Sequence, residues 1–198
     1  MCCFSSPVKR CAGRRAAWTR LLAAPVLIAT FAVATAQSVR SEPVRDDASG
    51  LTVVPPAGYG ASPIAPARIS VKKPADRDTG CQVGFTPMPQ NAAYTQDKIN
   101  GLIATQQWLD VARGTLTLNY DILDTAPFAQ GDIRGVVFVG DLKQRPGIPP
   151  RSKDVRTLFF LLETPKGRTA TVCVGEKASF DARRTEFDAV AHGVTPPQ

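Results

Sequence analysis

Alternation of apolar and polar positions dominates the chain from residue 51 onward and predicts a fold rich in β-strands. Segments with this period or with strand composition are 51–56, 68–73, 81–85, 116–123, 135–142, 156–163 and 168–174. Glycine and proline separate them, so the stretch AGYGASPIAPA (57–67) is expected to be a loop. The stretch TPKG (164–167) has the composition of a compact hairpin turn.

Two segments change to helical spacing. Residues 95–114 are predicted to form a helix, with Thr95 as its cap and Gly114 as its stop. Its apolar stripe consists of Ile99, Leu102, Ile103 and Leu109. Trp108 lies off this stripe, so either the helix breaks in two or the indole packs on a neighbouring loop.

The last periodic segment, TEFDAVAHGV (185–194), is also predicted to be a helix. Thr185 and Asp188 have the spacing of a capping box, and Gly193 would end the helix. One helical face would carry Phe187, Val190, Ala191 and Val194.

The order of elements indicates an α+β fold. Short connections favour a mainly antiparallel sheet of about six to seven strands, with two helices packed on it. Residues 51–198 are expected to form one domain. Residues 37–50, which are polar and lack periodicity, are expected to be a flexible leader.

Residues 1–36 have the order of a signal peptide. A basic stretch ends at Arg20, an uncharged apolar run follows, and Ala34 and Ala36 form an A-x-A cleavage site before Gln37. The apolar run is shorter than the ~20 residues of a membrane-spanning helix. Cleavage is therefore favoured over an uncleaved N-terminal anchor, and the product is expected to be periplasmic or secreted, with no stable membrane span.

The net charge of +7 arises mostly from this segment. Residues 1–36 hold five Lys and Arg and no acid; removing five from the 24 basic residues of the chain leaves 19, against 17 acidic ones. A nucleic-acid-binding protein would keep its basic excess on the folded domain, so nucleic acid is not expected as a partner.

Cysteine usage points to an oxidising compartment. Cys2, Cys3 and Cys11 would leave with the signal, so Cys81 and Cys173 remain and are expected to form a disulfide. Two buried free thiols are the alternative. Strand periodicity places Cys173 on the face opposite to Val172. Cys81 shares its face with Val83 and Phe85, and a bridge needs both sulfur atoms on one side of the sheet. The bridge therefore requires either a sheet that is covered on both faces or a bulge.

Two stretches of the chain resemble PsbP-like and DcrB-like proteins. One is the opening LTVVPPAGYG (51–60), and the other is the closing stretch 168–197, which has a strand, a spacer with Phe180 and a short helix. Those families are small α/β/α sandwiches found in exported or lumenal settings. The resemblance implies the same layered fold and an accessory role beside larger partners. It implies no catalytic residue, because these families share none.

No catalytic, metal or cofactor site is expected. His192, the only histidine, lies in the last turn of the second predicted helix, where a structural or surface role is favoured. Asp76 and Asp78 lack the later ligands of a calcium loop. Asp121 and Asp124, as a candidate acid–base pair, would face opposite sides of a strand.

One basic segment, residues 143–156, is a candidate contact for an anionic surface or an envelope protein. Its cations are Lys143, Arg145, Arg151, Lys153 and Arg156. Three prolines stiffen it, and such a loop can attract a phospholipid headgroup or an acidic protein face. The competing interpretation is a solvated loop that protects a sheet edge from aggregation.

These features predict an exported, non-enzymatic accessory protein that binds a partner. The alternatives are a small envelope hydrolase, or a ligand-carrying module with an apolar cleft between sheet and helix. A deep pocket near Trp108 would favour the ligand-carrying module.

Overall fold

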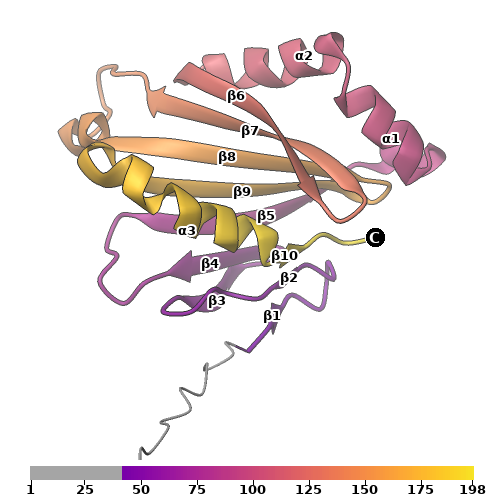
Figure 1. The fold of residues 1–198 in the computed structure, drawn as a ribbon, viewed down its shortest axis with the longest axis horizontal. Helices are drawn as coiled ribbons and strands as arrows, with labels where there is room; N and C mark the ends of the chain where they lie inside the picture. Colours follow the sequence, from indigo (N-terminus) through magenta and orange to yellow (C-terminus); the bar gives the residue numbers. More distant parts are fainter. Residues whose placement is uncertain (1–41) are drawn as a thin grey trace, which may run out of the picture. The chain divides into compact units, whose positions relative to one another are not determined.

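A seven-stranded antiparallel sheet organises the chain (Figure 1). The computed structural model describes residues 42–198, so the predicted signal peptide lies outside the described residues. The strand order is β3-β4-β5-β9-β8-β7-β6, which leaves β3 and β6 as the two edges. The bounds are β3 Gly60–Ala65, β4 Arg68–Lys72, β5 Gly80–Pro87, β6 Tyr120–Gln130, β7 Ile133–Leu142, β8 Val155–Thr164 and β9 Gly167–Glu176.

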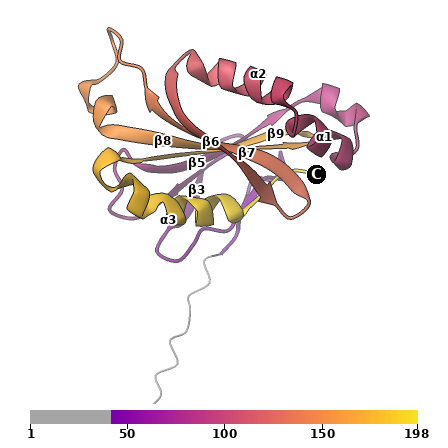
Figure 2. The ribbon, with the colours of Figure 1, turned by 45° about the horizontal axis from the view of Figure 1, so that its top comes forward.

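Helices cover both faces of the sheet (Figure 2). Helices α1 (Gln96–Ile103) and α2 (Gln106–Thr117) lie on one face, and α3 (Phe180–His192) lies on the other. The α3 side holds the larger core, which includes Phe160, Phe180 and Phe187. A second core under α2 is centred on Phe138 and Phe159. The α+β prediction, with helices on both sides of an antiparallel sheet, is confirmed.

The first predicted helix breaks in two, which was one of the two alternatives. Thr105 caps α2, because its side chain accepts a hydrogen bond from the backbone N–H of Trp108 at 3.3 Å. Gly114 does not stop this helix, which continues to Thr117. The strand predicted to begin at 116 therefore begins later, at Tyr120. Packing of α2 against the sheet outweighs the low helix propensity of one glycine.

The proline-containing stretch 57–67 was wrongly predicted to be a loop throughout, and the strand predicted over 116–123 extends farther than expected, through a second proline. Gly60–Ala65 forms β3, and β6 continues through Pro127 to Gln130. Pro63 and Pro127 are tolerated because both strands lie at an edge of the sheet, where an N–H that faces solvent is not needed for pairing. The glycine and proline content of these two stretches therefore gave no indication that they belong to edge strands.

Helix α3 begins at Phe180, before the predicted start at 185. Thr185 lies inside the helix, so the predicted capping box is wrong, whereas Gly193 is the C-cap as expected. The earlier start places Phe180 in the core, where its ring lies 6.0 Å from that of Phe187. The short helices are η1 Pro89–Ala93, η2 Pro150–Asp154 and η3 Lys177–Ser179.

A small second sheet joins the two ends of the domain. It consists of β1 (Val44–Arg45), β2 (Thr52–Val53) and β10 (Val194–Thr195), in the order β1-β2-β10. The leader prediction is therefore wrong for residues 44–50, which form β1 and the turn to β2. In that turn the backbone N–H of Ser49 donates to Asp46 at 2.9 Å. Within residues 42–198, no helix is both long and apolar enough to cross a membrane.

Candidate functional site

Cys81 and Cys173 form a disulfide between adjacent strands. Cys81 of β5 lies directly opposite Cys173 of β9, with a Cα–Cα distance of 4.0 Å and an S–S distance of 2.07 Å. Both residues are buried in the core on the α3 side. A core disulfide fits an exported protein, because disulfides persist in oxidising compartments.

The register removes the conflict in strand periodicity. Val83 pairs with Thr171 and Phe85 with Thr169, so these residues share the α3 face with the disulfide. Val172 packs in the opposite core, beneath α2. No bulge separates β5 from β9; instead, both faces of the sheet are covered, which was the first of the two conditions for the bridge.

Two cations of the predicted basic segment are held by carboxylates of this chain. Arg151 donates from Nε to Asp78 at 2.9 Å and from Nη1 to Glu176 at 2.8 Å. Arg156 donates to both oxygens of Asp141, at 2.9 and 3.2 Å. Asp78, which was considered above as part of a calcium loop, is thus an ion-pair partner of Arg151. Its pKa is lowered by the hydrogen bond from Arg151.

The other three cations of that segment differ in their partners. Lys143 Nζ donates to the Thr117 carbonyl at 2.6 Å, and Arg145 donates to the Leu118 carbonyl. Lys153 has no hydrogen bond or ion pair with residues 42–198. The five predicted cations therefore do not form one free basic surface, because four of them are engaged by the protein itself.

Asp76 and Arg183 form the centre of a polar cluster that anchors α3. Arg183 Nη1 and Nη2 donate to the two Asp76 oxygens at 2.9 and 3.0 Å. Thr79 and the backbone N–H of Lys73 also donate to Asp76, at 3.0 and 3.1 Å. Burial raises the pKa of Asp76, but these hydrogen bonds outweigh it and hold the pKa below its ordinary value.

Tyr59 and Glu186 extend this cluster. The Tyr59 hydroxyl accepts from Arg183 Nη2 at 3.0 Å and donates to Glu186 at 2.8 Å. Lys73 Nζ lies 2.5 Å from the other Glu186 oxygen, and its hydrogen bond lowers the pKa of that carboxyl. Each side chain is satisfied by the others, so the cluster is a structural clamp between α3 and the loops before β3 and β5.

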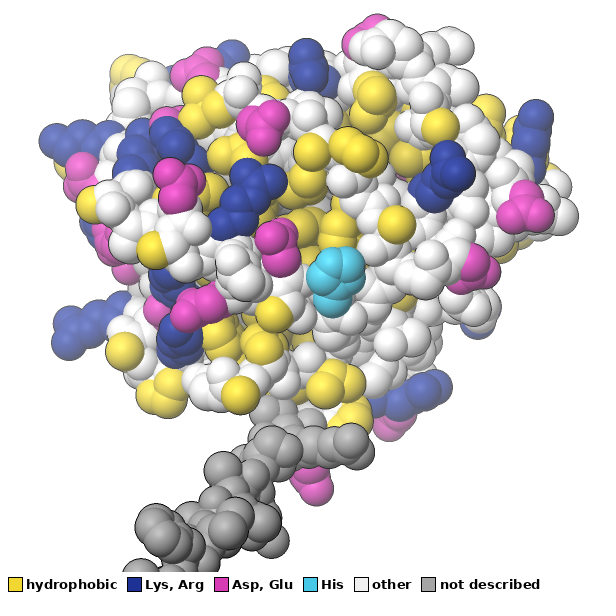
Figure 3. Space-filling view, viewed as in Figure 1, with side chains coloured by type: hydrophobic (Ala, Val, Ile, Leu, Met, Phe, Trp, Pro, Cys, Tyr) yellow, Lys and Arg dark blue, Asp and Glu magenta, His cyan; other side chains and the backbone are white. Residues whose placement is uncertain are grey.

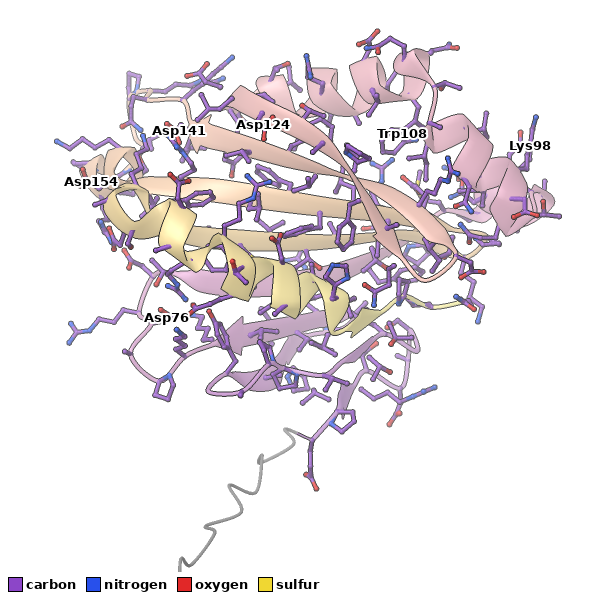
Figure 4. All side chains as sticks on the ribbon, viewed as in Figure 1. Asp76, Lys98, Trp108, Asp124, Asp141 and Asp154 are labelled. Atoms are coloured by element: carbon purple, nitrogen blue, oxygen red, sulfur yellow. A yellow bond between two sulfur atoms is a disulfide. The ribbon has the colours of Figure 1, made fainter. Side chains whose placement is uncertain are left out.

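A bulge corrects the prediction for Asp121 and Asp124. The register shifts between Ile122 and Asp124, so Asp121 pairs with Asp141 and Asp124 with Val139. The extra residue places both carboxylates on one face of the sheet, together with Asp141. Asp124 and Asp141 are labelled in Figure 4. Asp121 lies 3.8 Å from Lys143, and Asp124 lies 3.9 Å from Arg184.

His192 lies at the surface, at the end of α3 (Figure 3). Its ring centroid is 5.0 Å from that of Phe128 on β6. Within residues 42–198, no three His, Cys, Asp or Glu side chains converge as metal ligands would.

An apolar groove of about 580 Å³ lies between the α1–α2 junction and the hairpin β6–β7. We name it the hairpin groove. Its lining residues are Ile103, Ala104, Leu109, Thr125, Ala126, Pro127, Phe128, Ala129, Arg134, Gly135 and Val136. The helix break at Thr105 shapes one wall, because it lets α1 and α2 diverge over the sheet.

Two arginines give the hairpin groove a positive character. Arg134 belongs to its lining, and Arg113 Nη2 donates to the lining hydroxyl of Thr125 at 2.9 Å. Neither arginine has an ion pair with a carboxylate of residues 42–198. The lining contains no Asp or Glu. The site therefore combines an apolar floor with two available guanidinium groups.

Trp108 lines a separate and smaller hollow of about 120 Å³. Arg168 lies 6.0 Å above its ring and pairs with the buried Glu163 at 2.5 Å (Trp108 is labelled in Figure 4). The hairpin groove is lined by Leu109 and not by Trp108. Sequence reasoning missed this groove, because its β6 wall lies within the stretch DTAPFAQGDI, which has the composition of a loop.

No family model matches the chain, and no curated protein matches it. The structure is similar to the solution structure of PsbP (CyanoP) from Synechocystis, with 9% identity, a TM-score of 0.49, and coverage of 79% of this chain and 92% of that one. It is also similar to a crystal structure from Bacteroides thetaiotaomicron, with 13% identity, a TM-score of 0.42, and coverage of 81% of this chain and 50% of that one.

Proposed function

We propose that this protein is an exported accessory factor of the bacterial envelope or the extracellular space, which binds a protein partner and catalyses no reaction of its own. The signal-like order of residues 1–36 and the buried Cys81–Cys173 bridge support export.

The observation that carries the binding role is an exposed apolar surface around α2. Of the seven large apolar side chains exposed within residues 42–198, four lie on α1, α2 or β6 or at the end of α2. They are Leu102, Val111, Leu118 and Leu123. Val111 and Leu118 are 67% and 66% exposed. Val111 and Leu118 lie seven residues apart, two turns along the helix, and therefore share one face of α2. A contiguous exposed apolar surface marks an interaction site more often than isolated apolar side chains do.

The test is a double variant, Val111→Asp with Leu118→Asp. Partner capture from envelope extract should fall sharply, because charges at the centre of an apolar contact must be desolvated. Ile64→Asp, at an exposed position of edge strand β3, is the matched control and should keep the partner. Equal capture by all three proteins would remove the α2 surface from the functional account.

Export is tested separately by intact-mass measurement of protein recovered from the periplasm or medium. The expected product begins at or near Gln37. A recovered product that retains Met1 through Ala36 would contradict cleavage.

A further inference from the structure

We infer that the hairpin groove binds an anionic amphiphile, namely an unbranched acyl chain that ends in a carboxylate. This goes beyond the proposed function, because the site is distinct from the outer surface formed by Val111 and Leu118.

The apolar lining sets the first requirement on the ligand. Eight of the eleven lining residues are Ala, Val, Ile, Leu, Phe or Pro. Two of the eight, Ala126 and Phe128, pack their side chains against the core on the α3 side, so the other six supply the apolar side chains of the groove. The volume, about 580 Å³, lies in the range of small-molecule sites. An apolar chain in this groove would remove both its own surface and the lining from water, which is favourable.

Charge sets the second requirement. Arg134 lies near the turn between β6 and β7, where it pairs with Ala129. Arg113 donates to Thr125, four residues before Ala129 on β6. The nearest acids along the chain, Asp110 and Asp132, do not line the groove. A guanidinium binds a carboxylate through two parallel hydrogen bonds, which a neutral head group cannot accept with the same strength.

Shape sets the third requirement. The wall from Thr125 to Ala129 is one strand segment, ~13 Å long at the rise of a β-strand. An extended acyl chain of medium length can lie along such a wall with its carboxylate at either arginine. A bulky or branched ligand would have to leave this straight wall.

An added peptide strand is a weaker candidate for the same place. Pro127 lies in the middle of the β6 wall and has no N–H to donate to an incoming strand. A peptide would also have to pair with a strand that carries a bulge near Asp124. An acyl chain needs no backbone hydrogen bonds and is therefore the better match.

The test uses the folded domain and dansyl-undecanoic acid as the probe. Its fluorescence should rise saturably on binding, and dodecanoate should displace it. Dodecanol, which has the same chain and no charge, should displace it about tenfold less well. Arg134→Gln should weaken probe binding about tenfold, and added salt should weaken binding to the unchanged protein.

Ala129→Phe fills the groove and should abolish binding. Ala65→Phe, at an exposed alanine of the other edge strand, is its matched control. Lys153→Gln removes an exposed cation elsewhere and controls for net charge. A circular dichroism melt would establish that each variant is folded.

Absence of a saturable signal with the folded protein would overturn the inference, as would a signal that Ala129→Phe leaves unchanged. Displacement by dodecanol and dodecanoate alike would also overturn the role of the arginines. Dimerisation that Ala129→Phe abolishes, without probe binding, would assign the groove to a second copy. Loss of partner capture in Val111→Asp with Leu118→Asp, with probe binding retained, separates this site from the partner surface.

Discussion

Arg183 on α3 grips Asp76, a residue 107 positions earlier in the chain, through two parallel hydrogen bonds. Their side chains are only 16% and 8% exposed. The pair connects the final helix to the loop between β4 and β5, on the edge-strand side of the sheet (Asp76 is labelled in Figure 4). It is therefore a tertiary contact that local sequence does not encode.

Asp76→Asn should destabilise the domain by about 3 kcal/mol, because it leaves the Arg183 guanidinium largely buried without its counter-charge. Urea unfolding at neutral pH, followed by circular dichroism, measures the change. Asp78→Asn is the matched control: its side chain is 53% exposed, so the loss of stability should be much smaller than that in Asp76→Asn. Equal losses for the two variants would contradict the anchoring role of Asp76.

The Asp76 carboxylate should make the stability of the domain depend on pH below neutrality. Burial raises the pKa of Asp76, but its hydrogen bonds, above all those from Arg183, hold that pKa below its ordinary value in the folded protein. The folded state therefore binds the proton less readily than the unfolded state. The stabilisation is fully present above the unfolded pKa and is lost as pH falls through the folded one. Asp141, Glu176 and Glu186, whose pKa values are also lowered, add to the same trend.

The free energy of unfolding should decrease as the pH is lowered from about 6 to about 2.5, the range in which carboxylates titrate. Asp76→Asn should show a shallower fall than the unchanged protein, because one proton-linked group is gone. An identical slope in both would show that Asp76 contributes nothing to the acid sensitivity.

Cys173→Ser should lower stability by about 2–5 kcal/mol, the usual cost of losing a native disulfide in a small secreted domain. The sequence separation of 92 residues makes the bridge a long constraint on the unfolded chain. Non-reducing peptide mapping of the exported protein should find the Cys81 and Cys173 peptides in one fragment. Recovery of both peptides with free thiols would contradict the bridge in the cell.

Arg151→Gln should lower the melting temperature only slightly, and less at high salt, because its two ion pairs are exposed to solvent and screened by salt. Lys153→Gln should change stability by less than about 0.5 kcal/mol. Thermal melts at low and high salt compare them. A loss of stability in Lys153→Gln as large as that in Arg151→Gln would show that the ion pairs of Arg151 do not contribute to stability.

Local hydrophobic patterns were sufficient to predict the elements in which the periodicity is strong. The strands β4, β5, β7, β8 and β9 alternate or run apolar because one or both of their faces are buried, and side-chain period follows directly from backbone geometry. Thr95 begins α1 as expected, through a hydrogen bond that its own side chain accepts from Lys98. The pairing of Cys81 with Cys173 followed from counting the cysteines that remain after the signal.

The remaining features depend on contacts between segments that are distant in sequence. Pro63 and Pro127 lie in strands because those strands ended up at the edges of the sheet, where a missing N–H costs little. The bulge near Ile122 turned Asp121 and Asp124 to one face. Arg151 and Arg156 found carboxylates from other segments, so a basic run in the sequence became a set of ion pairs. The hairpin groove likewise exists only because two short helices and one hairpin meet over the sheet, and no local pattern records that meeting.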